Sequence, residues 1–127
     1  QVLKSIDGAL VVTAPGVLSE LVVSKSINFV VENGIRLLGI VENMSYFKCP
    51  ETGKIYYLLG RSSGEELARK YNTQRLAKIP LDPYISEALS SGKPYYLAYP
   101  NGEAAKAVRE LGKRILELIG ENASPRV

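Results

Sequence analysis

The sequence has 127 residues, of which 46% are hydrophobic and 23% charged, with a formal net charge of +3. This composition is typical of one soluble globular domain with its own core. The chain has no histidine and one cysteine, which excludes Ser-His-Asp and Cys-His catalysis, histidine metal sites and an internal disulfide. The basic residues are spread out and no apolar run could span a bilayer. We therefore expect no nucleic acid and no membrane as partners, and a reducing, cytoplasmic location.

The first third of the chain predicts a strand–helix–strand unit. Residues 9–13 form a short continuous apolar run, as in a buried strand. Apolar residues recur at helical spacing from about Leu18 to Asn33, with Ser19 as the expected cap and Gly34 as the left-handed stop. The run from Arg36 to Glu42 predicts a second buried strand. Two strands joined through a helix indicate a parallel pair with a right-handed crossover.

The middle of the chain predicts an excursion followed by another helix and strand. Aromatic runs flank a turn with proline and glycine, which indicates an aromatic hairpin or loop around residues 45–59. Ser62 and Glu65 have the spacing of a capping box, which predicts a helix that runs to about Tyr71. Residues 75–79 form another short strand.

The last third predicts two helices. Asp82 can cap a helix that starts with Pro83 and stops at Gly92. Residues 93–100 look irregular, and an amphipathic helix is expected over residues 101–120, with a flexible tail at 121–127. Together these elements predict an α/β fold with three layers, in which a mostly parallel sheet is flanked by helices.

Asn43 is the first candidate for a binding site. It follows the buried strand directly, and ligands of open α/β sheets bind outside the carboxyl ends of the strands. The alternative is that Asn43 only forms the turn that begins the loop, since asparagine is common in turns.

Cys49 is the one soft metal ligand in the chain, and a lone thiol can equally be inert. Cys-Pro followed by a glycine at a loop tip is a shape that metal-binding loops use, but a second cysteine normally completes it, and Thr52 stands nearby instead. No phosphate-binding loop of the usual kinds is present, because the Gly-Lys pairs lack both the upstream glycine and the following hydroxyl.

Four segments, in order, resemble the carboxyl-terminal half of the Mrp/ApbC P-loop ATPases, which are iron–sulfur cluster carriers related to MinD and ParA. The segments are Asp-Gly-Ala-Leu-Val-Val-Thr-Ala-Pro at 7–15, Leu-Gly-Ile-Val-Glu-Asn-Met-Ser-Tyr-Phe-Lys-Cys-Pro at 38–50, Ile-Pro-Leu-Asp-Pro at 79–83 and Ser-Gly-Lys-Pro at 91–94. The resemblance covers the chain in sequence order up to Pro94.

The resemblance implies half of a P-loop NTPase fold that binds ATP, dimerises around the nucleotide and passes clusters to recipient proteins. It places Asn43 and the segment Pro80, Leu81 and Asp82 at the adenine, although Asp82 also has its helix-cap interpretation. It makes Cys49 the first ligand of an iron–sulfur cluster. Thr52 departs from the family at the second ligand, and one cysteine alone cannot hold a cluster.

The family's amino-terminal half, with its Walker loop, is absent from this sequence. Residues 1–120 are therefore expected to be the carboxyl-terminal portion of one P-loop NTPase domain, a fragment of a longer ATPase that does not hydrolyse ATP by itself. A sheet cut in this way exposes an apolar edge, so edge pairing or a homodimer is expected. Two alternatives stay open at this point: a fragment of a partition or septum-placement ATPase, and a stand-alone interaction domain without nucleotide function.

Overall fold

The computed structural model describes residues 5–122. The elements alternate between strands and helices along the chain, as the sequence predicts. In order they are β1 (Ala9–Thr13), α1 (Val17–Glu32), β2 (Leu37–Glu42), β3 (Phe47–Lys48), β4 (Ile55–Tyr56), α2 (Gly64–Lys70), β5 (Arg75–Lys78), α3 (Pro83–Ser90), α4 (Tyr95–Ala98) and α5 (Glu103–Asn122).

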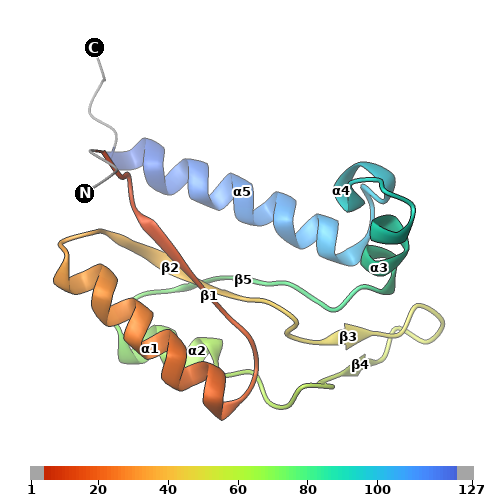
Figure 1. Ribbon diagram of the computed structural model, residues 1–127, viewed down its shortest axis with the longest axis horizontal. Coiled ribbons are helices and arrows are strands. Elements are labelled where there is room, and N and C mark those ends of the chain that lie inside the picture. Colours follow the sequence, from red (N-terminus) through yellow and green to blue (C-terminus); the bar gives the residue numbers. More distant parts are fainter. Residues whose placement is uncertain (1–4, 123–127) are drawn as a thin grey trace.

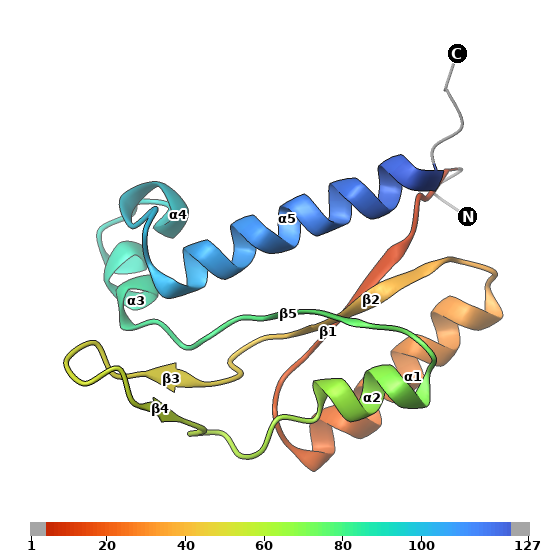
Figure 2. The same cartoon turned by 180° about the vertical axis from the view of Figure 1, so that it is seen from behind.

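A parallel sheet with the strand order β1-β2-β5 forms the middle layer. Helices α1 and α2 cover one face and α5 covers the other (Figure 1), and the view from behind shows the same layers (Figure 2). The predicted three-layer α/β architecture is therefore confirmed. Strands β3 and β4 pair antiparallel in a separate hairpin, which confirms the predicted excursion.

Each face of the sheet has its own apolar core. On one face, Ile27 of α1 and Leu67 of α2 pack with Ile40 of β2. On the other face, side chains of α5 pack against a cluster of Leu38, Val41 and Leu76. Because β2 is buried on both faces, its sequence reads as a continuous apolar run rather than an alternating one.

Helix α1 departs from the prediction at its start. It begins after Gly16, whose φ of 122° few other residues adopt, and no side chain caps it. The expected cap, Ser19, lies inside the first turn, so that prediction is wrong. The predicted stop is confirmed, because Gly34 has a φ of 68° and its N–H binds the carbonyl of Val31.

One apolar stripe of α1 is not covered by any described residue. Its inward positions are buried as predicted, but four large apolar side chains of the same helix are more than half exposed: Leu21, Val22, Phe29 and Val31. Val12 of the edge strand β1 is also 58% exposed. Strand β1 pairs only with β2 among the described strands, so the expected apolar edge is present.

The carboxyl-terminal elements mostly follow the prediction. Asp82 caps α3 with Pro83 as the first helical residue. The stretch expected to be irregular contains one helical turn, α4, where the N–H of Tyr99 binds the carbonyl of Tyr95. Gly120 does not end α5, which continues to Asn122, so that predicted stop is wrong. The rest of the predicted tail, residues 123–127, lies outside the described residues.

Strands β2 and β5 approach each other closely at Gly39, which has no side chain. A Cβ atom at Gly39 would lie 2.6 Å from Cγ of Leu76 and 2.7 Å from the carbonyl oxygen of Gln74. We therefore expect Gly39→Ala to lower the free energy of unfolding by about 1–3 kcal/mol, as overpacking does.

Gly112→Ala is the matched control, because a Cβ at this position in α5 meets nothing within 4 Å. It should raise the free energy of unfolding by roughly 0.5–1 kcal/mol through helix propensity. Urea unfolding of both variants measures the two effects. Equal effects of the two substitutions would contradict the packing described here.

Candidate functional site

The candidate site lies at the edge of the sheet where the three parallel strands end. The N–H of Asn43 donates to the carbonyl of Thr13, at the end of β1, over 2.7 Å. On its other side, Ile79 binds the main chain of both Glu42 and Ser45, at 2.8 and 2.9 Å. The main chain of Asn43 therefore lies between the ends of β1 and β5.

Asn43 also forms a tight turn, as its alternative interpretation predicts. Its Oδ1 accepts from the N–H of Met44 over 2.9 Å. Met44 has a φ of 52°, a left-handed conformation that is uncommon for a residue with a side chain. No acceptor for the Nδ2 group of Asn43 is found among residues 5–122. The side chain therefore retains two donors and a second lone pair for a ligand.

The segment from Pro80 to Asp82 continues from β5 beside the hairpin. The N–H of Leu81 donates to the carbonyl of Tyr46 over 2.7 Å, and Pro80 is fully buried. The buried ring of Pro80 can shape this loop, whereas half-buried Leu81 lies closer to the surface. The four residues predicted at the adenine thus share one edge of the sheet.

Both carboxylate oxygens of Asp82 are engaged inside the protein. Oδ1 accepts from the N–H of Tyr84 at the start of α3, which confirms the helix-cap interpretation. Oδ2 accepts from the hydroxyl of Tyr95 over 2.5 Å. Burial, followed by this hydrogen bond, raises the pKa of Tyr95 to about 12. The Asp82 carboxylate thereby ties α3 to α4.

Cys49 lies at the turn of the β3–β4 hairpin. The N–H of Cys49 donates to the carbonyl of Lys54, and the N–H of Gly53 donates back to the carbonyl of Cys49. The Thr52 hydroxyl, followed by the backbone N–H groups of Thr52 and Glu51, lowers the pKa of the Cys49 thiol. A lowered pKa favours the thiolate, which is the form that binds metals.

A cavity of about 330 Å³ brings Cys49 together with part of the predicted nucleotide segment. Leu81 and Asp82 line it beside Cys49, whereas Asn43 does not. An ion pair between Lys48 and Glu103 joins the hairpin to α5 over 3.6 Å. The full lining is Lys48, Cys49, Pro50, Gly53, Leu81, Asp82, Pro83, Tyr84, Asn101, Gly102 and Glu103.

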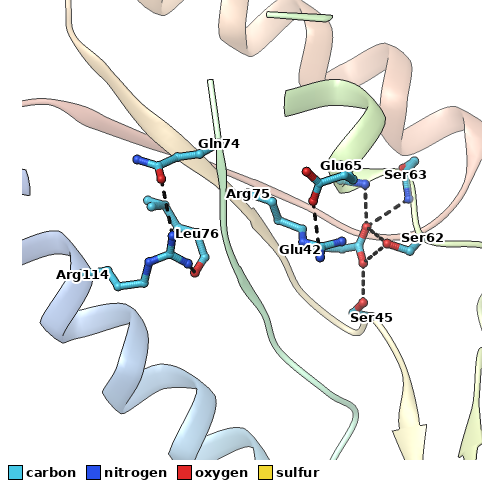
Figure 3. A network of polar contacts seen from close by, with 10 residues as sticks. Glu42, Ser45, Ser62, Ser63, Glu65, Gln74, Arg75, Leu76 and Arg114 are labelled. Carbon is cyan, nitrogen blue, oxygen red and sulfur yellow. Dashed lines mark hydrogen bonds and ion pairs between the residues drawn. The ribbon is translucent and has the colours of Figure 1, made fainter. Parts of the chain in front are cut away.

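Glu42 is the residue of this region that sequence reasoning did not single out. It is fully buried at the end of β2, and its carboxylate accepts hydrogen bonds from groups before and after the hairpin (Figure 3). Ser45 Oγ donates to Oε2, and Ser62 Oγ donates to both oxygens, at 2.7 and 2.9 Å. The backbone N–H groups of Ser63 and Gly64 donate to Oε1 over 3.0 and 2.7 Å.

These contacts correct the predicted capping box. Ser62 binds Glu42 instead of capping α2, and Glu65 forms an ion pair with Arg75 over 3.4 Å. The cap position is Ser63, whose side chain makes no capping hydrogen bond. Glu42 takes the role of the cap because its carboxylate binds N–H groups at the start of α2.

The same hydrogen bonds keep Glu42 ionised. Burial by itself raises the pKa of Glu42, but hydrogen bonds from Ser45 and Ser62 and from the two backbone N–H groups outweigh burial and lower the pKa. A carboxylate at the end of an otherwise apolar buried strand was the available signal, because such a group requires buried donors.

Within residues 5–122, no three His, Cys, Asp or Glu side chains are grouped so that they could hold a metal ion. Among the described helices, none is both long and apolar enough to cross a membrane.

Comparison with known proteins identifies the family. Residues 1–116 match the family model for ParA, described as the NUBPL iron-transfer P-loop NTPase. The chain belongs to this family of P-loop NTPases. The resemblance stated from the four sequence segments is therefore confirmed, and with it the half P-loop NTPase fold.

Curated relatives carry names that agree with this family. An iron–sulfur cluster carrier protein of Saccharolobus solfataricus is 37% identical over 122 residues, which are 96% of this chain and 41% of that protein. The cytosolic Fe-S cluster assembly factor nubp2 of Xenopus tropicalis is 38% identical over 94% of this chain and 43% of its own length. The chain thus spans less than half the length of these relatives.

Solved structures give the same fold. A nucleotide-binding protein of Archaeoglobus fulgidus in complex with ADP is 36% identical, with a TM-score of 0.58 over 77% of this chain and 43% of that chain. The cell division ATPase MinD of Pyrococcus furiosus is 26% identical, with a TM-score of 0.67 over 88% of this chain and 43% of that chain. The likeness to MinD is consistent with the septum-placement alternative but does not favour it, since the curated relatives are carriers and assembly factors.

The buried carboxylate predicts a pH dependence of stability. The pKa of Glu42 is lower in the folded chain than its ordinary value of 4.5. The stabilisation that the ionised Glu42 adds to the free energy of unfolding is therefore complete above pH 4.5, and it is lost as the pH falls through the lower pKa of the folded state. We expect Glu42→Gln to reduce the free energy of unfolding near neutral pH, and the difference from the wild type to shrink below about pH 4.

Urea unfolding at several pH values measures this difference. Glu65→Gln is the control, because Glu65 is exposed and its pair with Arg75 is a surface ion pair. A difference between wild type and Glu42→Gln that stays constant as the pH falls would show that Glu42 is not held ionised.

Proposed function

We propose that this chain supplies the adenine-binding and cluster-binding part of an ATP-dependent iron–sulfur cluster carrier that acts in the cytosol. The observation that carries the proposal is that Asn43 and the 80–82 segment lie at the carboxyl edge of one parallel sheet, and that Leu81 and Asp82 of this segment line a cavity together with Cys49. Family membership supports nucleotide and iron–sulfur chemistry together. The nubp2 relative is named as a cytosolic assembly factor, and we propose the same location for this chain.

Asn43 is the proposed adenine ligand. Its Nδ2 group can donate to a ring nitrogen while Oδ1 accepts from the exocyclic amine, the bidentate pattern by which asparagine reads adenine. Oδ1 keeps its bond from Met44, which holds the amide plane in place. Leu81 and Asp82 are proposed to border the base, with buried Pro80 fixing the loop and Asp82 fixing α3.

Cys49 is the proposed cluster ligand, with the cluster as cargo rather than as a resident group. A thiolate with a lowered pKa on an outward hairpin suits reversible binding. One chain supplies a single thiolate, whereas iron–sulfur clusters usually have four cysteine ligands. We therefore include a homodimer in the proposal, with one Cys49 from each copy and the other ligands from a recipient protein or a small thiol.

The chain is not expected to hydrolyse ATP alone. Its sequence has no Gly-x-x-x-x-Gly-Lys-Ser/Thr motif to hold the β- and γ-phosphates. In this proposal its role is to bind the base and the cluster, while phosphate binding and magnesium binding belong to a Walker loop outside this sequence.

Nucleotide titration tests the role of Asn43. In the longest form of the polypeptide found in its source cells, Asn43→Ala should weaken ATP binding roughly 5- to 150-fold, the loss of one bidentate base contact of about 1–3 kcal/mol. It should also abolish any preference for ATP over GTP, because guanine presents an acceptor where adenine presents the amine. Asn28→Ala, on the exposed surface of α1, is the control. Unchanged ATP affinity in Asn43→Ala would overturn this assignment.

Thr52 allows a gain-of-function test of Cys49. The Thr52 hydroxyl is close enough to the Cys49 thiol to lower its pKa. Thr52→Cys would therefore place a second sulfur next to the sulfur of Cys49. We expect Thr52→Cys to retain more iron and sulfide per chain than the wild type after anaerobic reconstitution and desalting, and Cys49→Ser to retain none.

Thr73→Cys is the matched control, since Thr73 lies in the turn after α2 and adds a thiol away from the hairpin. If Thr73→Cys retains as much iron as Thr52→Cys, the retention reflects thiol number and not the proposed site.

A further inference from the structure

One buried carboxylate fastens both ends of the segment that carries Cys49. We call residues 46–61 the cysteine arm; it contains β3, β4 and the turn between them. Ser45, just before the arm, donates to Glu42 Oε2, and Ser62, just after it, donates to both oxygens. Glu42 therefore crosslinks two positions that are 17 residues apart in the sequence, and no other described side chain bonds to both (Figure 3).

The exit of the arm is held a second time by the same group. Oε1 accepts from the N–H groups of Ser63 and Gly64, which begin α2. A Cβ at Gly64 would lie 2.9 Å from this oxygen, so the close contact requires glycine at this position. The base of the arm is thus bound to the end of β2, the most buried strand of the sheet.

The start of the arm also depends on the turn that contains Asn43. This turn is held by Asn43 Oδ1 on the N–H of Met44, and by Ser45, which binds Ile79 through its N–H and Glu42 through its hydroxyl. These bonds hold Met44 in its left-handed backbone conformation. The proposed adenine ligand and Ser45, just before the arm, are consequently fixed by neighbouring bonds.

We propose that Glu42 is the positioning residue of Cys49: through Ser45 and Ser62 it fixes where the cysteine arm holds the thiolate relative to Asn43 and the 80–82 segment. The importance of that position rests on the proposed function, but the positioning itself can be measured without nucleotide or cluster. The arm also meets the rest of the protein where the carbonyl of Tyr46 accepts from Leu81 and where Lys48 pairs with Glu103. Of these links only those of Glu42 lie at both ends of the arm, so loosening them should widen the range of Cys49 positions without unfolding the sheet.

Ser62→Ala and Ser63→Ala form a matched pair for the test. Both replace a serine beside Glu42, but Ser62 Oγ binds the carboxylate whereas the buried Ser63 Oγ has no hydrogen-bond partner among residues 5–122. Ser63→Ala keeps the backbone N–H that binds Glu42. Only Ser62→Ala removes a link between the arm and Glu42.

The position of Cys49 can be measured because it is the only cysteine of the chain. A nitroxide at Cys49 and a second at Lys113→Cys, on the exposed side of α5, give a distance distribution by pulsed electron spin resonance. We expect a broader distribution in Ser62→Ala and an unchanged one in Ser63→Ala. Amide exchange at Leu81, whose N–H binds the carbonyl of Tyr46 in the arm, should rise about tenfold in Ser62→Ala, the effect of losing one hydrogen bond to a charged group.

Two substitutions of Glu42 itself should broaden the distance distribution to different degrees. Glu42→Gln keeps the shape, and its amide can donate to the two serine hydroxyls, so it should broaden the distribution less than Glu42→Ala does. Thermal unfolding of each variant separates positioning from general loss of stability. If Ser62→Ala lowers the melting temperature but leaves the distance distribution as narrow as in the wild type, Glu42 has only a structural role and the proposal is overturned.

Iron retention separates this proposal from the function on which it rests. If Ser62→Ala both broadens the distribution and loses iron more quickly than Ser63→Ala, positioning and cluster binding are both supported. If the distance distribution broadens in Ser62→Ala but the wild type and both variants retain no iron, the proposed function fails while the positioning role of Glu42 stands.

Discussion

The buried carboxylate of Glu42 is the constraint on which the carboxyl edge of this sheet depends. An ion buried without partners is strongly unfavourable, and in this position it would neutralise or disrupt the strand. Two hydroxyls and two backbone N–H groups offset that penalty, and together they determine where the chain enters α2 after its excursion. The start of α2, the base of the hairpin and the turn at Asn43 are therefore one connected structure.

Sequence periodicity predicted the elements whose partners lie nearby or whose burial is complete. Strand β2 was recognisable because burial on both faces makes it a continuous apolar run, and α3 because Asp82 and Pro83 carry their cap signal locally. The role of Glu42 could not be predicted in this way, since its donors lie up to 22 residues away. The spacing of Ser62 and Glu65 fits a capping box equally well, and only the tertiary contact decides that Ser62 faces Glu42 instead.

Periodicity also could not distinguish covered from uncovered apolar positions on α1. The helix is apolar around much of its circumference, and half of that surface meets β1 and β2 while the other half, with Phe29, is exposed. A parallel sheet normally has helices on both faces and further strands beside it, and the relatives are more than twice as long as this chain. The apolar pattern of α1 is the same whether or not a further element covers it, so the sequence alone does not show which side chains are exposed.

The proposed binding groups near the carboxyl edge of the sheet do not form a complete site by themselves. In the proposed function, Asn43 binds the base but not the phosphates, and Cys49 supplies one sulfur but not a complete ligand set. Both groups become effective only when other residues approach them in a defined geometry, so their own placement has to be fixed in advance. A buried anion with four donors provides such placement, because each bond restrains the others and the carboxylate itself is shielded from water. In the proposed function, the rigid base at Glu42 and the half-buried, partly unsatisfied groups at Asn43 and Cys49 therefore complement each other, because one fixes the placement that the others need.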